Sequence, residues 1–197
     1  FPYLYIWLFF KAQSYSEEVK LFEDQTSFYF PRQLMDKGSQ PNFSLADYIS
    51  PTGDDHIGLF AVTAGHGIEN IIKEYQAKND DYSEIMAKVL ADRLAEAAAE
   101  WLHKKVRTEY WGYSKDEDLD LSAMLYEKYF GIRPAPGYPA CPDHKEKDKI
   151  WKLLNVEDQI GISLTESRAM FPAASVCGWY FSHPKARYFS VLKNEVL

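Results

Sequence analysis

The sequence predicts an α+β fold built on a largely antiparallel sheet. Three observations support this: the chain opens on an apolar run, its middle has helical periodicity, and its last third returns to short strand-like runs. Strands at both ends with helices between them are typical of α+β folds. With 197 residues the chain is long enough to bury one substantial core, so we expect a single domain over 1–197.

Composition narrows the classes of function. Hydrophobic residues make up 46% and charged residues 26%, as in soluble globular proteins. A formal net charge of −7 argues against broad binding to nucleic acid or to anionic membranes. Aromatic residues at 16% suggest an aromatic-lined pocket. With only Cys141 and Cys177, two reduced thiols in a cytoplasmic protein are the simplest interpretation, although a single disulfide stays open.

The first 77 residues alternate strand-like runs with turns. The opening run is too short to span a bilayer and is typical of a buried strand, whereas residues 11–24 are polar and show no period. A proline ends the second strand. In order, we expect strands over 1–10, 26–31 and 56–63, a helical turn capped by Ser44 and reaching Tyr48, a glycine turn over 65–67, and a helix over 68–77.

The strongest helical pattern runs from Tyr82 to about Tyr110. Asp81 with Glu84 forms a candidate capping box at its start. Apolar residues recur at three- and four-residue steps, which predicts that they form one buried face. The residues of this face are Met86, Leu90, Leu94, Ala97 and Trp101, widened by Ile85 and Val89.

A line of carboxylates follows the same helix. Asp92, Glu96 and Glu100 are spaced by four residues, and Glu96 lies roughly 20° from Val89 in a helical projection at about 100° per residue. Glu96 therefore borders the apolar face. Two interpretations stay open: a solvated acidic stripe partly paired with Arg93, or a carboxylate at a pocket edge that receives a cation or a hydroxyl.

Residues 131–142 contain four prolines and two glycines. Proline fixes φ and keeps the preceding residue extended, so this track is expected to be stiff and non-helical. A stiff track holds Arg133 and Tyr138 in place with little loss of entropy on binding. The alternative is a plain connector between a helix from 114 or 118 to 130, with Gly131 as its C-cap, and a helix to Leu154 that opens on an Asp143–Glu146 capping box.

The last third predicts strands over 161–164, 175–181 and 187–192, the latter two joined by a hairpin loop over 182–186. At this point four blocks stand in a familiar order: residues 91–97, 131–139, 164–167 and 178–184. Together they closely resemble the C-terminal activation (reactivation) domain of cobalamin-dependent methionine synthase. The resemblance covers about residues 45–192 well and the first 40 only loosely.

The resemblance implies a function in methionine biosynthesis. Domains of this family bind S-adenosylmethionine and supply its methyl group for reductive reactivation of a cobalamin held by a neighbouring domain. Flavodoxin or a flavoprotein reductase donates the electron. The chain would thus be part of a cytoplasmic methyltransferase, would carry no cobalamin itself, and is not expected to catalyse the full reaction.

By the same resemblance, the chain contributes ligand contacts and no catalytic or metal-binding residue. Arg133 suits the carboxylate of S-adenosylmethionine, and Glu96 suits its ammonium or a ribose hydroxyl. Aromatic faces attract a sulfonium. The implied contacts are Glu96, Arg133, Ala135, Gly137, Tyr138 and Tyr188, with Phe189 alongside and with Asp92 facing the cobalamin domain.

One departure from the family pattern lowers the expected affinity. Family members carry an aspartate near the start of the domain that also contacts the ligand, and no counterpart is identifiable here. We therefore expect the chain to be a piece truncated at the N-terminus and possibly the C-terminus. Losing one hydrogen bond to a charged group costs roughly 1.5–3 kcal/mol, or about 10- to 150-fold in affinity, so binding should be weakened but detectable.

Two other classes of function stay in view. Cys141-x-x-His144 and Cys177-x5-His183 supply four possible metal ligands, but the spacing is not that of a standard zinc module. The second class is a docking module for flavodoxin, a reductase or the cobalamin domain that binds no ligand of its own. Its candidate surfaces are the basic clusters 103–107 and 145–152, which could equally be ordinary solvated helix faces.

Overall fold

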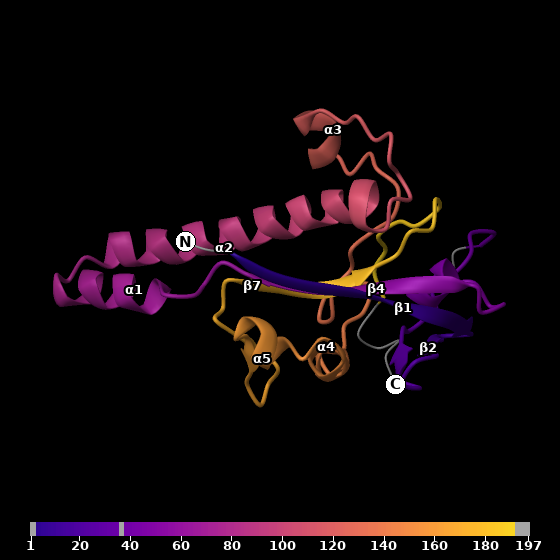
Figure 1. Cartoon of the computed structure of the whole chain (residues 1–197), viewed down its shortest axis with the longest axis horizontal. Helices are drawn as coiled ribbons and strands as arrows, with labels where there is room; N and C mark the ends of the chain where they lie inside the picture. The colour runs from indigo at the N-terminus through magenta and orange to yellow at the C-terminus, as the bar shows by residue number, and fades with distance from the viewer. Residues whose placement is uncertain (1–2, 36–37, 192–197) are drawn as a thin grey trace.

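The computed structural model describes residues 3–35 and 38–191, which form a five-stranded antiparallel sheet with helices on both faces (Figure 1). The strand order is β3-β2-β1-β4-β7, and a separate two-stranded sheet pairs β5 with β6. The predicted α+β class is confirmed. The strands are β1 Leu4–Tyr15, β2 Glu18–Leu21, β3 Ser27–Tyr29, β4 Asp55–Thr63, β5 Ser163–Leu164, β6 Met170–Phe171 and β7 Ser175–Tyr180.

The first strand is longer than predicted and continues into a strand that was not predicted. Residues Leu4–Ala12 pair with β4, and Ala12–Tyr15 pair with β2. In β2 only Val19 and Leu21 are buried, and four residues are too few to reveal an alternating pattern. Residues 1–2 of the predicted strand lie outside the described residues.

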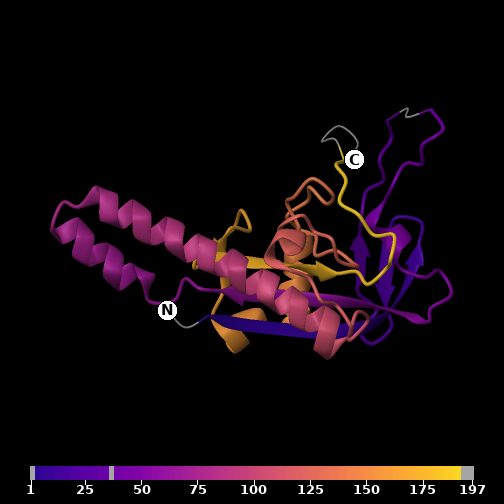
Figure 2. The same cartoon turned by 90° about the horizontal axis from the view of Figure 1, so that it is seen from above.

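Helices cover both faces of this sheet. The helices α1 Ile68–Ala77 and α2 Asp81–Lys105 form a hairpin along one face and extend beyond the end of the sheet, as seen from above in Figure 2. The last predicted turn of α2 is π-helical, over η2 Val106–Tyr110. On the opposite face lie α4 Glu146–Leu154 and α5 Val156–Ile160, of which α5 was not predicted. The predicted turn after Ser44 is confirmed as η1 Leu45–Tyr48.

Three predicted helix ends are wrong. The N-cap of α2 is Asp80, whose carboxylate accepts from the Ser83 amide at 3.0 Å, and not Asp81. At α4 the N-cap is Lys145 and not Asp143, and the predicted capping box is absent, because the Asp143 carboxylate accepts from the Lys145 amide at 2.8 Å. The helix expected over 114 or 118 to 130 shrinks to α3, Leu121–Leu125. The chain leaves the helical region at Glu127, which has a φ of 52°.

The buried face of α2 is not the predicted one. The residues that pack on the sheet are Ala91, Ala95, Ala98, Ala99 and Leu102, whereas most of the predicted apolar face is exposed, with Ile85 at 62% and Leu90 at 55%. The sheet itself supplies the bulk here, since Phe60 and Tyr180 stack with ring centroids 4.5 Å apart beneath the helix. Ala98 and Ala99, together with Leu102, pack against these rings.

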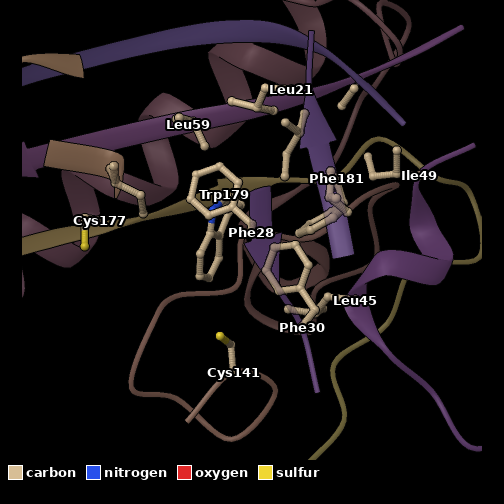
Figure 3. Packing of buried hydrophobic residues seen from close by; sticks show 14 of the residues in the cluster. Leu21, Phe28, Phe30, Leu45, Ile49, Leu59, Cys141, Cys177, Trp179 and Phe181 are labelled. Atoms are coloured by element: carbon tan, nitrogen blue, oxygen red, sulfur yellow. The ribbon is translucent and has the colours of Figure 1, made fainter. Parts of the chain in front are cut away.

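The main core lies between the other sheet face and α4–α5. Trp179 of β7 stands at its centre, edge-on to Phe28 and Phe30 with centroid distances of 5.6 and 4.9 Å (Figure 3). Cys141 and Cys177 are buried in this core as free thiols, so the disulfide left open by the sequence does not form. The dense packing around Trp179 fixes β7, and β7 in turn carries the site.

Candidate functional site

The proline track is hydrogen-bonded to the outer edge of β7 and its C-terminal extension. Ile132 and Phe181 exchange two backbone hydrogen bonds of 3.0 Å each, and the amide of Trp179 donates to the carbonyl of Pro134 at 3.0 Å. A Cβ at Gly178 would overlap that carbonyl, so the close approach requires glycine. Gly131 is not the predicted helix cap, because α3 ends at Leu125; its φ of 79° and the nearby Phe181 carbonyl require glycine here. The track is therefore held rigidly against β7.

The segment 187–191 lies along this proline track. Tyr48 holds it, because its hydroxyl donates to the Arg187 carbonyl at 3.2 Å and accepts from the Arg187 amide at 3.3 Å. The Arg133 amide donates to the Tyr188 hydroxyl at 3.1 Å, and the Val191 amide to the Pro139 carbonyl at 2.8 Å.

The strand and hairpin predicted for this segment are wrong over residues 187–191, which form no β-ladder. Their neighbour is the track, in which Pro134, Pro136 and Pro139 have no amide hydrogen to donate. Residue 192 lies outside the described residues.

A pocket of about 430 Å³ opens between α2, the track and this segment. Six of the seven ligand contacts predicted from the sequence line it, although they come from three separate parts of the chain. The lining residues are Glu96, Glu127, Arg133, Pro134, Ala135, Tyr138, Pro139, Ala140, Val176, Tyr188, Phe189 and Ser190.

Arg133 is the cation of the pocket and is held between two carboxylates. Its Nε and Nη2 donate to Glu100 Oε2 at 3.4 and 3.3 Å, and its Nη1 lies 3.9 Å from Glu96 Oε2. Burial, the largest single effect, lowers the pKa of Arg133, but the surrounding acidic groups, with Glu100 first among them, together raise this pKa above its ordinary value. Burial also raises the pKa of Tyr188, which stays a neutral hydroxyl. The pocket thus offers a fixed cation beside the half-exposed carboxylate of Glu96.

A larger hollow, of about 680 Å³, lies around Glu117 and Tyr129. Its walls come mainly from the loop 113–119 and the turn 128–130, and it contains none of the residues predicted from the sequence. The smaller pocket is the better candidate, because six of the predicted ligand contacts line it and its arginine, Arg133, lies between two carboxylates.

Comparison with known proteins identifies the family. The family described as "Vitamin B12 dependent methionine synthase, activation domain" matches residues 4–195. The chain belongs to this family. A solved structure described as "Crystal Structure of the MetH Reactivation Domain bound to AdoHcy" superposes with a TM-score of 0.92 at 45% sequence identity. The match covers 95% of this chain and 61% of that one, so the chain spans about 61% of that protein's length.

Gly137 has a packing role in this activation domain. It does not line the pocket, and a Cβ on it would overlap the ring of His144. Gly137 has a φ of 90°, and its amide donates a hydrogen bond to the Cys141 carbonyl at 2.8 Å. Both features shape the turn that carries Tyr138. A direct contact between Gly137 and a ligand stays a prediction.

Asp92 lies one turn before Glu96 and outside the pocket. It lines an adjoining hollow of about 410 Å³, together with Arg93 and Ala173. Glu96 and Val176 line both spaces. The two hollows of the activation domain therefore meet at Glu96, and the expectation that Asp92 faces another domain stays a prediction.

The first basic cluster of the sequence is not a surface patch, because His103 and Arg107 are fully buried. In the second cluster, Lys147 is also buried and its ammonium donates to the Arg168 carbonyl at 3.0 Å, while Lys149 is bound to Glu146. Neither cluster presents the continuous positive face expected of a docking surface.

Within residues 3–35 and 38–191, no group of three or more His, Cys, Asp or Glu side chains is arranged to hold a metal ion. Over the same ranges, no helix has the length and the apolar character needed to cross a membrane.

Two carboxylates at or near the pocket were not among the ligand contacts expected from the sequence. Glu100 belonged to the predicted carboxylate line, and its four-residue spacing from Glu96 was the signal that could have identified it. Glu127 sits in a segment that was expected to be helical. It reaches the pocket because the chain turns there instead.

Proposed function

We propose that this activation domain binds S-adenosylmethionine in the pocket around Arg133 and supplies its methyl group for reactivation of the cobalamin of methionine synthase. One observation carries the proposal: Arg133 and Glu96 lie 3.9 Å apart at the wall of a pocket that also has two tyrosines. The bound AdoHcy named for the similar structure supports it, since AdoHcy is S-adenosylmethionine without the transferable methyl group.

The residues present fit this ligand. An amino-acid group carries a carboxylate next to an ammonium, and Arg133 next to Glu96 offers the opposite charges in the same arrangement. Tyr138 and Tyr188 are 59% and 40% exposed, so their ring faces can pack against the adenine or the sulfonium. The volume of about 430 Å³ lies in the range usual for small-molecule pockets, about 300–1,000 Å³.

The chain needs no general acid or base for this role. When bound, S-adenosylmethionine supplies a methyl group that its sulfonium already activates for transfer. The pocket residues bind and orient it: Arg133 and Glu96 fix the amino-acid end, and the rigid track fixes Ala135 and Tyr138 around the nucleoside. Such positioning converts an encounter of two molecules into a reaction within one assembly.

The wider assembly belongs to the same proposal. The chain acts as part of a cytoplasmic methyltransferase, with the cobalamin domain on the Asp92 side and with flavodoxin or a flavoprotein reductase as electron donor. The hollow at Asp92, which shares Glu96 with the pocket, supports that side. The free buried thiols of Cys141 and Cys177 are compatible with a reducing compartment.

Isothermal titration with S-adenosylmethionine and with AdoHcy tests the binding. The wild-type chain should bind both, and Arg133→Ala should weaken both by about tenfold or more, the effect of losing a hydrogen bond to a charged group. Arg168→Ala is the matched control, because Arg168 pairs with Asp148 at 2.8 Å and does not line the pocket. A wild-type chain that binds neither compound would leave the docking-module alternative.

A further inference from the structure

Glu100 holds one edge of the Arg133 guanidinium. It lies one helical turn after Glu96 in α2, and its Oε2 accepts from both Nε and Nη2 of Arg133. A guanidinium is planar, so fixing the Nε–Nη2 edge also fixes the direction of Nη1. Nη1 is the nitrogen that lies 3.9 Å from Glu96, at the wall of the pocket. Glu100 thus sets which edge of Arg133 remains for a ligand.

Glu100 is itself anchored from behind. The hydroxyl of Tyr129 donates to its Oε2 at 3.4 Å, and Arg107 Nη1 lies 3.8 Å from its Oε1. Arg107 is fully buried and is bound by both oxygens of Glu117, at 2.7 and 2.8 Å. Its guanidinium carbon also lies 3.9 Å from the centroid of the Tyr129 ring. These fixed partners leave the Glu100 side chain little freedom to move.

Arg107, the cation behind Glu100, is bound by Glu117 and so leaves the carboxylate of Glu100 available to Arg133. Glu117 makes two hydrogen bonds to Arg107, whereas Arg107 Nη1 and Glu100 Oε1, 3.8 Å apart, are both buried without a hydrogen-bond partner. If the charge of Glu100 were removed, Glu96 would be the carboxylate remaining close to Arg133. Arg133 would then turn toward Glu96 and occupy the group that the ligand's ammonium requires.

We propose that Glu100 is a positioning residue that presents Arg133 to the ligand's carboxylate and keeps Glu96 free for its ammonium. The inference rests on the proposed function, because it assigns a role around the same pocket. It predicts a selective defect: loss of Glu100 weakens binding of the amino-acid end of the ligand and not of its nucleoside end.

Titration with two probes separates these ends. AdoHcy carries the amino-acid group, whereas methylthioadenosine has the same nucleoside and sulfur but neither carboxylate nor ammonium. Glu100→Gln should weaken AdoHcy by about tenfold, which corresponds to about 1.4 kcal/mol, and leave methylthioadenosine unchanged. Glu84→Gln is the matched control, because Glu84 is also on α2 and pairs with a cation, Lys88, but does not line the pocket.

A double-mutant cycle gives a second readout that needs AdoHcy alone. If Glu100 acts through Arg133, adding Glu100→Gln to Arg133→Ala should cause no further loss of affinity, whereas independent effects would add. Glu100→Asp, which keeps the charge, should recover part of the affinity lost in Glu100→Gln.

Each result bears on a different claim. A wild-type chain that does not bind AdoHcy sinks the proposed function. If Arg133→Ala weakens binding while Glu100→Gln binds like wild type, the role of Glu100 is wrong and the proposed function stands. Equal weakening of both probes by Glu100→Gln, or additive effects in the cycle, would mean that Glu100 supports the fold and does not position Arg133.

Discussion

The amide of Trp179 donates to the carbonyl of Pro134 at 3.0 Å, and this bond ties the wall of the pocket to the centre of the main core. Trp179 packs between Phe28, Phe30 and the rest of the core, whereas Pro134 is the neighbour of Arg133 in the track. The position of Arg133 is therefore set by the packing of the main core around β7.

Gly178→Ala should damage the pocket as well as the fold. The new methyl group would overlap the Pro134 carbonyl and push the track away from β7. Crowding of this kind costs about 1–3 kcal/mol of unfolding free energy, and AdoHcy affinity should fall with it. Gly58→Ala is the control, because its methyl group would crowd Tyr180 and Phe9 but not the track. Equal losses of affinity in the two variants would contradict a special role for the Trp179–Pro134 bond.

The stability of the fold should fall as the pH drops below about 6.5. His103 is buried between the rings of Tyr180 and Tyr129, and this burial, with the charges of Arg107 and Arg133, holds its pKa well below the ordinary value. In the unfolded chain this histidine takes up a proton near pH 6.5, whereas in the native state it does not. The contribution of neutral His103 to the free energy of unfolding is therefore complete above that pH and is lost progressively below it.

Urea unfolding between about pH 5 and pH 8 measures this effect, which is at most about 1.4 kcal/mol per pH unit for one proton. His103→Gln should flatten the decline, whereas the same change at the exposed His56 should leave it. If His103→Gln does not alter the slope of unfolding free energy against pH, groups other than His103 cause the loss of stability in acid.

Removing one partner of the buried Arg107–Glu117 pair should be costly. Both side chains are almost fully buried, so Arg107→Met would leave Glu117 as an uncompensated charge and should lower the unfolding free energy by about 3–5 kcal/mol. The double variant Arg107→Met with Glu117→Leu removes both charges and should recover much of this loss. The urea midpoints of the wild-type chain and the two variants measure the loss and its recovery. A double variant no more stable than Arg107→Met would show that the unpaired charge of Glu117 is not the cause of the loss.

Substitutions on the alanine face of α2 should destabilise the fold, whereas substitutions on the apolar face predicted from the sequence should have little effect. Ile85 is 62% exposed, so Ile85→Lys should change the unfolding free energy by no more than about 0.5 kcal/mol. Ala99 is fully buried against the aromatic sheet face, so Ala99→Leu should lower it by about 1–3 kcal/mol. Thermal melts of both variants suffice, and a large loss in Ile85→Lys would mean that its side chain is covered in solution.

Elements whose pattern is local could be predicted from the sequence, whereas those decided by distant partners could not. The runs that became β4 and β7 are continuous and largely apolar, and they are buried along nearly their whole length. The run that became α1 was also predicted as a helix with its observed bounds. The face of α2 did not follow its pattern, because the choice between leucines and alanines depends on the size of Phe60 and Tyr180 beneath it. The segment 187–191 has the composition of a strand but faces a proline track that cannot complete a ladder.

The candidate site divides in the same way. The stiff proline track drew attention to Arg133, and the helical spacing drew attention to Glu96. The family resemblance assembled them into one set. The spacing placed Glu100 in the same carboxylate line, but neither source paired it with Arg133, which lies 33 residues further along the chain and meets it only when the track returns to β7.

The proline track also has a consequence for the solubility of the fold. β7 is the last strand of the sheet, and an open edge of this kind is where another chain can add a strand and start aggregation. Here the track occupies that edge, and its prolines offer few amide hydrogens to an incoming strand. The segment that walls the pocket therefore also protects the sheet against association between copies of the chain.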